Sequence, residues 1–375
     1  MNFLCTKNHL LQGLQIGEFI IGNNTNLPIL NNVLIQTDKT KLNLITTNLE
    51  LGISLLIPAK IKKEGSLTIP IKLLGSFIRT LPNGTLEGTE HNKTLIIKTA
   101  ETISKFKGED STNYPILPKI EKKQPVIITA KNFAYNIQKV IKATSVVHSK
   151  PELTGVYIRF ASKQAIFAAT DSFRLSEKKQ KVEEKQEYEF ILPVKTAQEI
   201  VRIFQQDESS SQLQCFITPS QALFEYLPNE NSLIPQMQIV SRMIEGDYPD
   251  YTQIIPQTWK TKIIVSRTDF LNNIKSAGLF ANKLQEVKLH ISPEQKKVNL
   301  QTQDYDMGEY KSSIPCTVEG EEQTITFNYQ YLLDGLQNID DEDVVIKIQQ
   351  NDTPAIIEPQ DSSGYTYILM PIRTI

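Results

Sequence analysis

The amino-acid sequence repeats one order of strands and helices three times, and this repeat constrains the fold more than any other feature. Each copy opens with a short apolar strand followed by a helix; the three strands are Asn2–Leu4, Val126–Ile128 and Ile263–Val265. The first two copies keep a nearly constant offset: 124 residues from Lys7 to Lys131, and 123 from Thr47 to Thr170 and from Pro70 to Pro193. Landmarks of the third copy follow after 132 to 137 residues, which indicates loop insertions.

Within each copy the spacing of the apolar residues alternates between the period of a helix and the period of a strand. In the second copy Phe133, Ile137 and Val140 form a stripe at helical spacing, whereas Val156 and Ile158 alternate as in a half-buried strand. Each copy is therefore predicted to run β-α-β-β-β-α-β-β, an antiparallel sheet with two helices, which is an α+β fold. The six predicted helices are Lys7–Gly17, Ile71–Thr80, Lys131–Thr144, Val194–Gln205, Arg267–Lys283 and Tyr329–Asn338.

Local signals refine this prediction. Ser266 with Asp269 is typical of a capping box at a helix start, and Asn83-Gly84 predicts a hairpin between short strands. Two polar runs, Lys119–Gln124 and Pro256–Lys260, separate the copies. The predicted domains are residues 1–122, 123–257 and 258–375.

Charge is distributed unevenly over these elements. The formal net charge of the chain is only −2, which by itself argues against a nucleic-acid-binding protein. The predicted helices, however, carry a net charge of +8, which leaves −10 for the rest of the chain. If the helices of all copies face one way, they form a basic surface that attracts phosphates without reading bases. The basic helix residues are Lys7, Lys72, Arg79, Lys131, Lys139, Lys142, Lys195, Arg202, Arg267, Lys275 and Lys283.

Motifs for catalysis or cofactor binding are missing from the sequence. The four histidines lie far apart, the three cysteines have no metal or redox spacing, and no phosphate-binding glycine loop or nucleophile elbow occurs. Asp304-Tyr305-Asp306 and the run Asp340–Asp343 are the acidic features that a metal ion could use. Because such residues are more often solvated, we predict no metal, no cofactor and no catalytic site.

Five short motifs follow one another along the chain: N-L-P-I-L at Asn26–Leu30, T-N-L-E at Thr47–Glu50, A-T-D-S-F-R-L at Ala169–Leu175, Y-P-D-Y at Tyr248–Tyr251 and Y-I-L-M-P-I-R at Tyr367–Arg373. In this order and with the threefold repeat, the sequence resembles the bacterial beta sliding clamp family, the beta subunit of DNA polymerase III, over its whole length. The resemblance implies three clamp domains per chain and a head-to-tail homodimeric ring around duplex DNA, with the basic helices facing the DNA. Such a ring holds polymerases, the clamp loader and other proteins with clamp-binding motifs, and confers processivity in DNA replication without a catalytic site.

The family also implies a hydrophobic groove between the second and third domains that binds short peptide motifs of partner proteins. Leu, Ile, Met and Pro side chains suit such a pocket, and the Arg174 guanidinium either shapes its rim or binds a partner's carboxylate or carbonyl. The matching residues are Leu153, Thr170, Ser172, Phe173, Arg174, Leu175, Pro249, Gln253, Ile254, Pro354, Ile368, Met370, Pro371, Ile372 and Arg373.

Ring closure in the family joins the first domain to the third domain of the partner, and the matching residues are Phe106, Leu279 and Phe280. Four positions depart from the family pattern. Gly108 replaces a second apolar residue beside Phe106 at the ring closure, and Asn24 replaces a DNA-contacting arginine of some members. At the groove, Gln253 replaces a frequent arginine, and Thr374-Ile375 extends the tail near the groove mouth.

Two other functions remain compatible with the residues alone. One is a peptide-binding scaffold of three α+β repeats that does not enclose DNA, and the other is a metal-dependent enzyme that uses Asp304 and Asp306. The N-terminus lacks a basic region followed by an apolar core, and no apolar stretch approaches ~18 residues. We therefore expect a cytoplasmic protein without a membrane segment.

Overall fold

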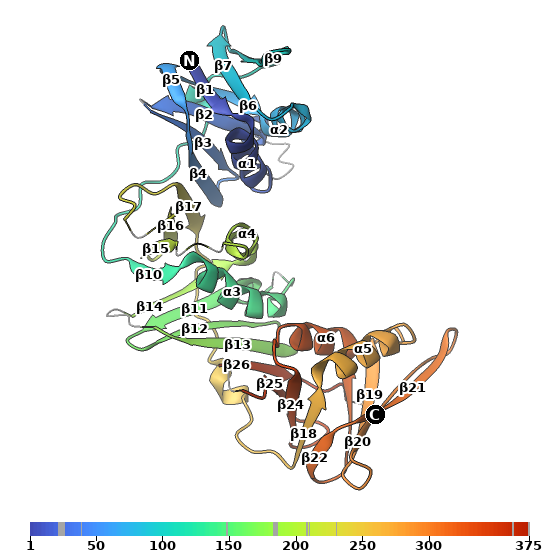
Figure 1. The fold of residues 1–375 in the computed structure, drawn as a ribbon. Helices are drawn as coiled ribbons and strands as arrows, with labels where there is room; N and C mark the ends of the chain where they lie inside the picture. Colours follow the sequence, from blue (N-terminus) through green and yellow to red (C-terminus); the bar gives the residue numbers. More distant parts are fainter. Residues whose placement is uncertain are drawn as a thin grey trace. The chain divides into compact units, whose positions relative to one another are not determined.

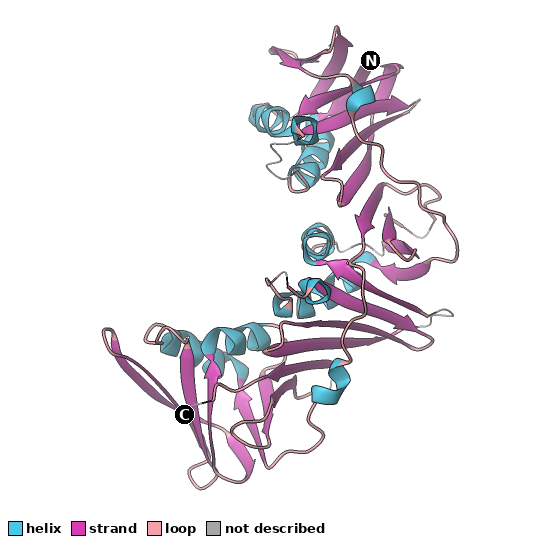
Figure 2. Ribbon diagram, turned by 180° about the vertical axis from the view of Figure 1, so that it is seen from behind, coloured by secondary structure: helices cyan, strands magenta, loops and turns pink. Residues whose placement is uncertain are grey.

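The structure is a computed structural model that describes residues 1–21, 27–38, 40–147, 149–182, 187–207, 209, 211–229, 231–361 and 364–373. These residues form two compact units. Unit 1 consists of Met1–Ala134 with Gln198–Met243, and unit 2 of Tyr135–Ala197 with Ile244–Ile375. Each unit combines antiparallel sheets with helices (Figures 1 and 2). Asn24, Asn26, Thr374 and Ile375, named above for the family resemblance, lie outside the described residues.

Unit 1 contains the first copy of the repeat and part of the second. The first copy comprises β1 (Asn2–Thr6), α1 (Lys7–Glu18), β2 (Asn32–Asp38), β3 (Lys41–Thr47), β4 (Leu51–Pro58), β5 (Lys60–Lys63), β6 (Gly65–Pro70), α2 (Ile71–Thr80), β7 (Thr85–His91), β8 (Thr94–Lys98) and β9 (Ile103–Lys107). The second copy adds β10 (Val126–Thr129), β15 (Gln212–Ile217), β16 (Gln221–Leu227) and β17 (Met237–Arg242). The helices α3 (Ala130–Val140) and α4 (Val194–Phe204) pass from one unit to the other.

Unit 2 contains the rest of the second copy and the third. Its strands from the second copy are β11 (Gly155–Ala161), β12 (Gln164–Thr170), β13 (Arg174–Lys181) and β14 (Tyr188–Pro193). The third copy comprises β18 (Thr261–Ser266), α5 (Arg267–Gly278), β19 (Glu286–Ser292), β20 (Lys297–Asp304), β21 (Gly308–Pro315), β22 (Thr317–Gly320), β23 (Gln323–Asn328), α6 (Tyr329–Gln337), β24 (Asp343–Ile348), β25 (Ala355–Pro359) and β26 (Tyr365–Leu369).

One pairing rule joins neighbouring copies. The last strand of the second copy, β17, pairs antiparallel with β4 of the first, and Val240 lies opposite Gly52. The last strand of the third copy, β26, pairs in the same way with β13 of the second, and Ile368 lies opposite Leu175. The result is an eight-stranded sheet, β10-β15-β16-β17-β4-β3-β2-β6, and a nine-stranded sheet, β14-β11-β12-β13-β26-β25-β24-β18-β22. Sheet pairing across copies explains why three sequence repeats form two compact units.

The remaining strands form two smaller sheets, β5-β1-β7-β8-β9 in unit 1 and β21-β20-β19-β23 in unit 2. Helices pack on the sheets through their apolar stripes. In α1, Leu10 and Leu14 are fully buried, and Gly13 lies so close to β3 that a Cβ there would be 2.7 Å from Leu44. None of the helices in the described part of the chain is long and apolar enough to span a membrane.

The predicted helices are largely confirmed. α2 has the predicted bounds, and the Ser266 side chain accepts a hydrogen bond from the Asp269 N–H, as its capping role requires. α5 ends at Gly278, so Lys283 lies beyond the helix instead of inside it. Each copy has more strands than predicted: among the described residues, four or five lie between the two helices and three follow the second helix.

The prediction of a hairpin at Asn83-Gly84 is wrong, because these residues connect α2 to β7. The hairpin turn lies instead at Asn92-Lys93, between β7 and β8. Both turn residues have positive φ angles, 48° and 59°, as a two-residue type I′ hairpin requires. Asn92-Lys93 lacks the glycine that marks most such turns, and Asn83-Gly84 has it, which explains the error.

The cap of α6 provides a test of local stability. The Asn328 Oδ1 atom accepts hydrogen bonds from the backbone N–H groups of Gln330, at 2.9 Å, and Tyr331, at 3.3 Å. We expect Asn328→Ala to lower the free energy of unfolding by about 1 kcal/mol, measured by urea titration. Asn351→Ala, in an exposed turn, is the matched control and should change it by less than about 0.5 kcal/mol. Equal values for the two variants would contradict the capping role.

Candidate peptide-binding surface and basic helices

The turn between β12 and β13 presents the centre of the predicted peptide-binding surface. The Thr170 hydroxyl donates to the Arg174 carbonyl at 2.6 Å, and Asp171 Oδ1 accepts from the N–H groups of Phe173 and Arg174 at 2.9 and 3.0 Å. Ser172 adopts a φ of 77°, which turns the chain sharply. The turn holds Phe173 outward with 61% of its surface exposed.

Met370 lies directly beside this turn. Its backbone N–H donates to the Phe173 carbonyl at 2.9 Å, because β26 continues the pairing of β13 to this point. Phe173 and Met370, which are far apart in the sequence, are therefore neighbours. We call Phe173 and Met370 together the peptide surface.

A buried apolar cluster supports the peptide surface. It contains Leu175 and Ile368 from β13 and β26, and Tyr251 from a short 3-10 helix, Tyr251–Ile254. The Tyr251 hydroxyl donates to Glu177 Oε2 at 2.8 Å. Burial, reinforced by this carboxylate, raises the pKa of Tyr251 above its ordinary value, so the phenol stays neutral. Ile254, at the end of the same 3-10 helix, is 46% exposed.

Three tyrosines at this cluster were not predicted as site residues. Tyr157 stacks on Tyr248 with a centroid distance of 4.9 Å, and both contact Tyr251 edge-on. Tyr248 and Tyr251 belong to the Y-P-D-Y motif, so the motif was the signal that could have identified them. Tyr157 lies between Val156 and Ile158, so periodicity alone assigns it to the exposed face of its strand.

Arg174 does not have the second role considered for it, which was to bind a carboxylate or carbonyl of a partner protein. Only 10% of its side chain is exposed, and Nε donates to Asp171 Oδ2 at 3.0 Å. Nη1 donates to Asp334 Oδ2 at 2.5 Å and Nη2 to the Lys142 carbonyl at 2.6 Å, while the guanidinium lies 4.2 Å from the Tyr331 ring centroid. All three nitrogens are thus bound within unit 2. Arg174 therefore fixes the turn from behind and is not available to a partner's carboxylate.

The other residues predicted for the peptide surface differ in burial, and two of them line a separate cavity. Leu153 is buried, Pro354 and Pro371 are half-buried, and Pro249 and Gln253 are exposed, with the Gln253 amide donating to Asp250 at 2.9 Å. Ile372 pairs instead with Thr326 through its backbone N–H. With Arg373 it lines a cavity of about 430 Å³ beside Lys288 and Asn351 that none of the other predicted residues lines. The contacts described for Ile372 and Arg373 thus lie on the Thr326 side, and their part in the peptide surface stays a prediction.

The basic helix residues differ in how they are held. Six are exposed on or near helices: Lys72, Arg79, Lys131, Lys195, Lys275 and Lys283. Lys142 is exposed but bonds Gln337 and Asp334. Lys7, Arg202 and Arg267 are half-buried and donate to the carbonyls of Leu81, Ile16 and Asp341 respectively.

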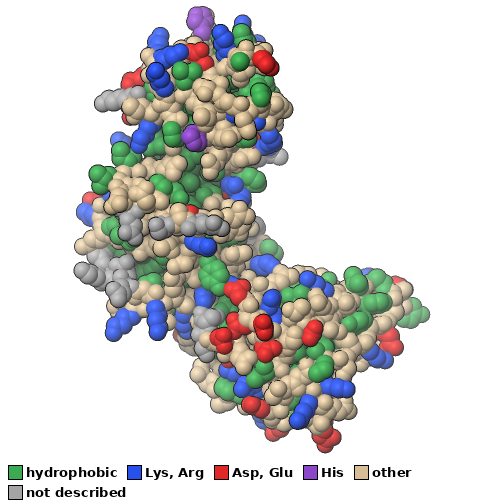
Figure 3. Space-filling view, in the orientation of Figure 1, with side chains coloured by type: hydrophobic (Ala, Val, Ile, Leu, Met, Phe, Trp, Pro, Cys, Tyr) green, Lys and Arg blue, Asp and Glu red, His purple; other side chains and the backbone are tan. Residues whose placement is uncertain are grey.

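Lys139 must be removed from the set that could face DNA. Its side chain is 7% exposed and donates to the Asn338 carbonyl and to Asp340 Oδ2, at 2.6 and 2.7 Å. Helical periodicity places Lys139 opposite the buried stripe, but α6 covers that position. The acidic run that follows α6 lies here as well, and Figure 3 shows a group of acidic side chains on unit 2 beside α6. The helix side of unit 2 is therefore not uniformly basic.

Helices lie next to one another within each unit. In unit 1, α1 contacts α2 through Glu18 and Arg79, 3.5 Å apart, and contacts α4 through the bond from Arg202 to Ile16. In unit 2, α3 contacts the end of α6, which packs along α5. Neighbouring helices thus contact one another within each unit, and the common basic side of the helices stays a prediction.

The residues predicted for ring closure have unequal exposure. Leu279 is 72% exposed, Phe280 is half-buried and stacks on Tyr310, and Phe106 is only 5% exposed because it packs on Phe77. The glycine at position 108 is explained by its neighbours, because a Cβ there would lie 2.4 Å from the Thr68 carbonyl oxygen. The second apolar side chain of the family pattern does not fit there.

The acidic residues considered for metal binding have structural partners. Asp304 Oδ1 accepts from the N–H groups of Asp306 and Met307, at 2.9 and 3.1 Å, and thereby closes the β20–β21 hairpin. Asp340 accepts from Tyr135 and Lys139, and Asp341 from the Asp361 N–H. Among the described residues, no group of three His, Cys, Asp or Glu side chains is arranged to hold a metal ion.

Comparisons with known proteins agree with this fold. The chain matches family models of the DNA polymerase III beta subunit in order: the N-terminal domain over residues 1–118, the central domain over 127–250 and the C-terminal domain over 252–373. The beta sliding clamps of Synechococcus elongatus and Bacillus subtilis are each 26% identical to it, over 100% of this chain and 99% and 100% of their own lengths. The crystal structure of the DNA polymerase sliding clamp from Bacillus subtilis has a TM-score of 0.92 at 26% identity, over 100% of both chains.

Three α+β repeats joined by continuous sheets define the DNA-clamp class of proteins. Within that class, the chain belongs to the DNA polymerase III beta-subunit family. Its role is that of a sliding clamp, a processivity factor and not a catalytic subunit.

Proposed function

We propose that two copies of this chain close head to tail into a ring that encircles duplex DNA in the cytoplasm. The proposed domains are residues 1–122, 123–257 and 258–375. The observation that carries the proposal is the pairing rule between repeat copies. The last strand of a copy pairs with the same particular strand of the preceding copy in both cases. β17 pairs with β4, and β26 pairs with β13.

Under the same rule, two of the described strands have no such pairing partner within one chain. β9 ends the first copy as β17 and β26 end theirs, and it is the edge of the five-stranded sheet. β21 occupies in the third copy the position of β4 and β13, and it is the edge of the four-stranded sheet. An exposed strand edge carries unpaired N–H and C=O groups that can pair with a second chain. In the ring, β9 of one chain therefore pairs with β21 of the other chain. A closed assembly then leaves neither edge free, and the exposed Leu279 lies near the joint.

The exposed basic residues give the ring a weak, sequence-independent attraction to DNA. Lys72, Arg79 and Lys131 from unit 1, with Lys195 and Lys275 from unit 2, contact phosphates. Because a closed ring retains DNA by topology, these contacts do not need to be strong. A net charge of −2 is compatible with this arrangement.

The peptide surface supplies the other half of the function. Short motifs of the replicative polymerase, the clamp loader and related partners bind at Phe173 and Met370 in this proposal. The exposed Phe173 and the half-buried Met370, over a buried cluster, provide a small hot spot that a short linear segment can use. A peptide held there tethers its protein to DNA for as long as the ring stays closed.

Small-angle X-ray scattering over a concentration series tests the ring. We expect a mass of about 85 kDa, twice the 42.5 kDa of one chain, and the distance distribution of a hollow particle. Retention on nicked circular DNA that is lost after linearisation is the matching functional result. A particle of 42.5 kDa at every concentration, without topology-dependent retention, would favour the open scaffold instead.

A further inference from the structure

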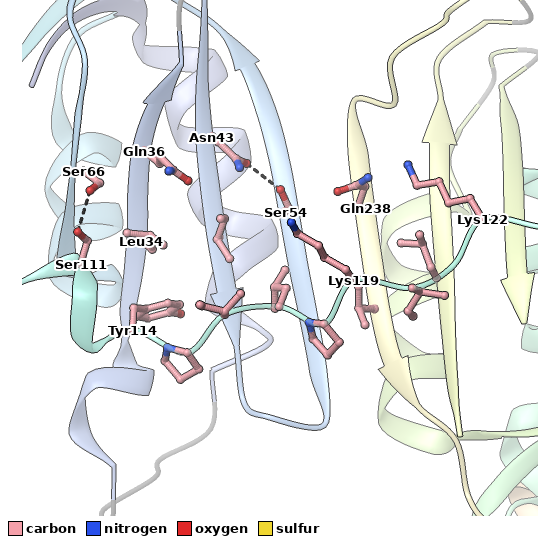
Figure 4. A pocket seen from close by; sticks show the side chains of 18 residues that line it. Leu34, Gln36, Asn43, Ser54, Ser66, Ser111, Tyr114, Lys119, Lys122 and Gln238 are labelled. Atoms are coloured by element: carbon pink, nitrogen blue, oxygen red, sulfur yellow. Dashed lines mark hydrogen bonds between the residues drawn. The ribbon is translucent and has the colours of Figure 1, made fainter. Parts of the chain in front are cut away.

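Unit 1 has a large cavity where the second copy of the repeat joins the first. Its volume is about 740 Å³, and Figure 4 shows it between a sheet face and the segment Pro115–Lys122, which we call the strap. The sheet face belongs to β2, β3, β4, β16 and β17, and is the side that α1 does not cover. A second cavity of about 200 Å³ lies next to it and shares Pro115–Pro118 and Val240.

This junction repeats the geometry of the peptide surface. The Thr47 hydroxyl donates to the Leu51 carbonyl at 3.0 Å, and Asn48 Oδ1 accepts from the N–H groups of Glu50 and Leu51, at 3.0 and 2.8 Å. Leu49 has a φ of 76°, as Ser172 has 77°. The Arg242 N–H donates to the Glu50 carbonyl at 2.8 Å, the bond that Met370 makes to Phe173 in unit 2.

The bond pattern fixes which residues are equivalent. Glu50 takes the place of Phe173, Arg242 that of Met370, and Gly52 that of Leu175. The missing side chain at Gly52 lets Leu117 of the strap pack against the sheet, because a Cβ there would be 2.3 Å from Leu117. The same backbone arrangement is thus present, but Leu117 of the strap packs where Leu175 would have its side chain, and the charged Glu50 and Arg242 stand in the places of Phe173 and Met370.

The cavity offers apolar and cationic groups together. Leu34, Ile45, Leu223 and Val240 give it apolar contacts on the sheet. The polar side chains beside them are largely bonded to each other: Ser54 to Asn43 at 2.8 Å, and Ser66 with Ser111 at 2.7 Å.

Cationic side chains lie at its rim. Figure 4 shows Lys119 reaching from the strap over the cavity toward Ser54. Lys122 is neutralised by Glu225 at 2.7 Å, whereas no described carboxylate forms an ion pair with Lys119. Arg242 lines the smaller neighbouring cavity, together with Glu50. Lys119 therefore favours a ligand that carries a carboxylate beside an apolar side chain.

We propose that this cavity is a second peptide site, which binds a short extended segment of a partner protein containing an apolar side chain next to a carboxylate. The apolar side chain lies on Leu34, Ile45 and Val240, and the carboxylate pairs with Lys119. Its volume lies within the ~300–1,000 Å³ usual for ligand sites. The inference rests on the proposed peptide surface of unit 2 only as the geometric comparison.

A selection experiment separates the two sites. A phage-displayed library of random heptapeptides is selected on the full chain carrying Phe173→Ala and Met370→Ala, which removes the peptide surface of unit 2. The enriched sequences are synthesised with a fluorescein label, and their Kd values are measured by fluorescence anisotropy. We expect enrichment of Asp or Glu next to Leu, Ile or Phe.

Substitutions in the cavity then locate the binding. Lys119→Glu reverses the charge of an exposed side chain, and Gln36→Trp fills the cavity from an exposed position on β2. Each should weaken binding at least tenfold. Lys98→Glu, an equally exposed lysine that does not line the cavity, is the charge-matched control and should change the Kd less than twofold.

Two outcomes would overturn the inference. In the first, no peptide is enriched on the doubly substituted chain although the unsubstituted chain selects peptides; the peptide surface of unit 2 then stands alone. In the second, peptides are enriched but Lys119→Glu and Gln36→Trp leave their Kd unchanged. Peptides enriched on neither chain would reject this site and the proposed peptide surface together.

Discussion

Peptide binding is expected to be lost when Phe173 and Met370 are both replaced by alanine, while the chain keeps its fold and its assembly. Phe173 is 61% exposed and Met370 half-buried, so their side chains contribute little to folding. The hydrogen bond between them joins backbone atoms and survives the substitution. Removing two central apolar anchors from a small interface costs about 2–4 kcal/mol each, which places the Kd of a micromolar peptide beyond measurement.

Fluorescence anisotropy with a peptide selected on the unsubstituted chain provides the measurement, and scattering checks that the mass is unchanged. Leu233→Ala is the control, because Leu233 is a 96% exposed apolar residue of unit 1 outside both sites. An unchanged Kd in the double variant would reject the assignment of the peptide surface.

Replacing Arg174 by methionine is expected to lower the free energy of unfolding by about 3–5 kcal/mol. The substitution keeps much of the side-chain volume but leaves the Asp171 and Asp334 carboxylates, each 13% exposed, without their shared cation. Lys142, 3.4 Å from Asp334, compensates only in part. Urea titration followed by circular dichroism measures the change.

The control for this prediction is Arg159→Met. Arg159 forms an ion pair of 3.7 Å with Glu187, in which the side chains are 43% and 70% exposed. Solvent screens such a pair, so its loss should cost less than about 0.5 kcal/mol. If the two variants were equally stable, Arg174 would not be the structural support of the turn, and a direct role toward partners would regain its basis.

The sequence predicted elements more reliably than the environments of individual side chains. Helix positions followed from apolar spacing and capping residues, which act within one or two turns of the chain. Lys139 was misplaced because its burial depends on α6, about 200 residues further along the sequence. The role of Arg174 was left between two alternatives because one of its two carboxylate partners, Asp334, lies on a helix of the next copy.

The sequence by itself determined the threefold repeat, the α+β class and the helix starts, because these follow from periodicity and from hydrogen bonds between near neighbours. Only the tertiary structure decided that β17 continues onto β4 and β26 onto β13, since strand pairing depends on edges that no local pattern records. That pairing places Met370 against Phe173 and Arg242 against Glu50. It also brings the strap over the first junction, where Gly52 stands in the place of the larger Leu175 and Leu117 packs against it, a difference that has meaning only once the two junctions are compared in space.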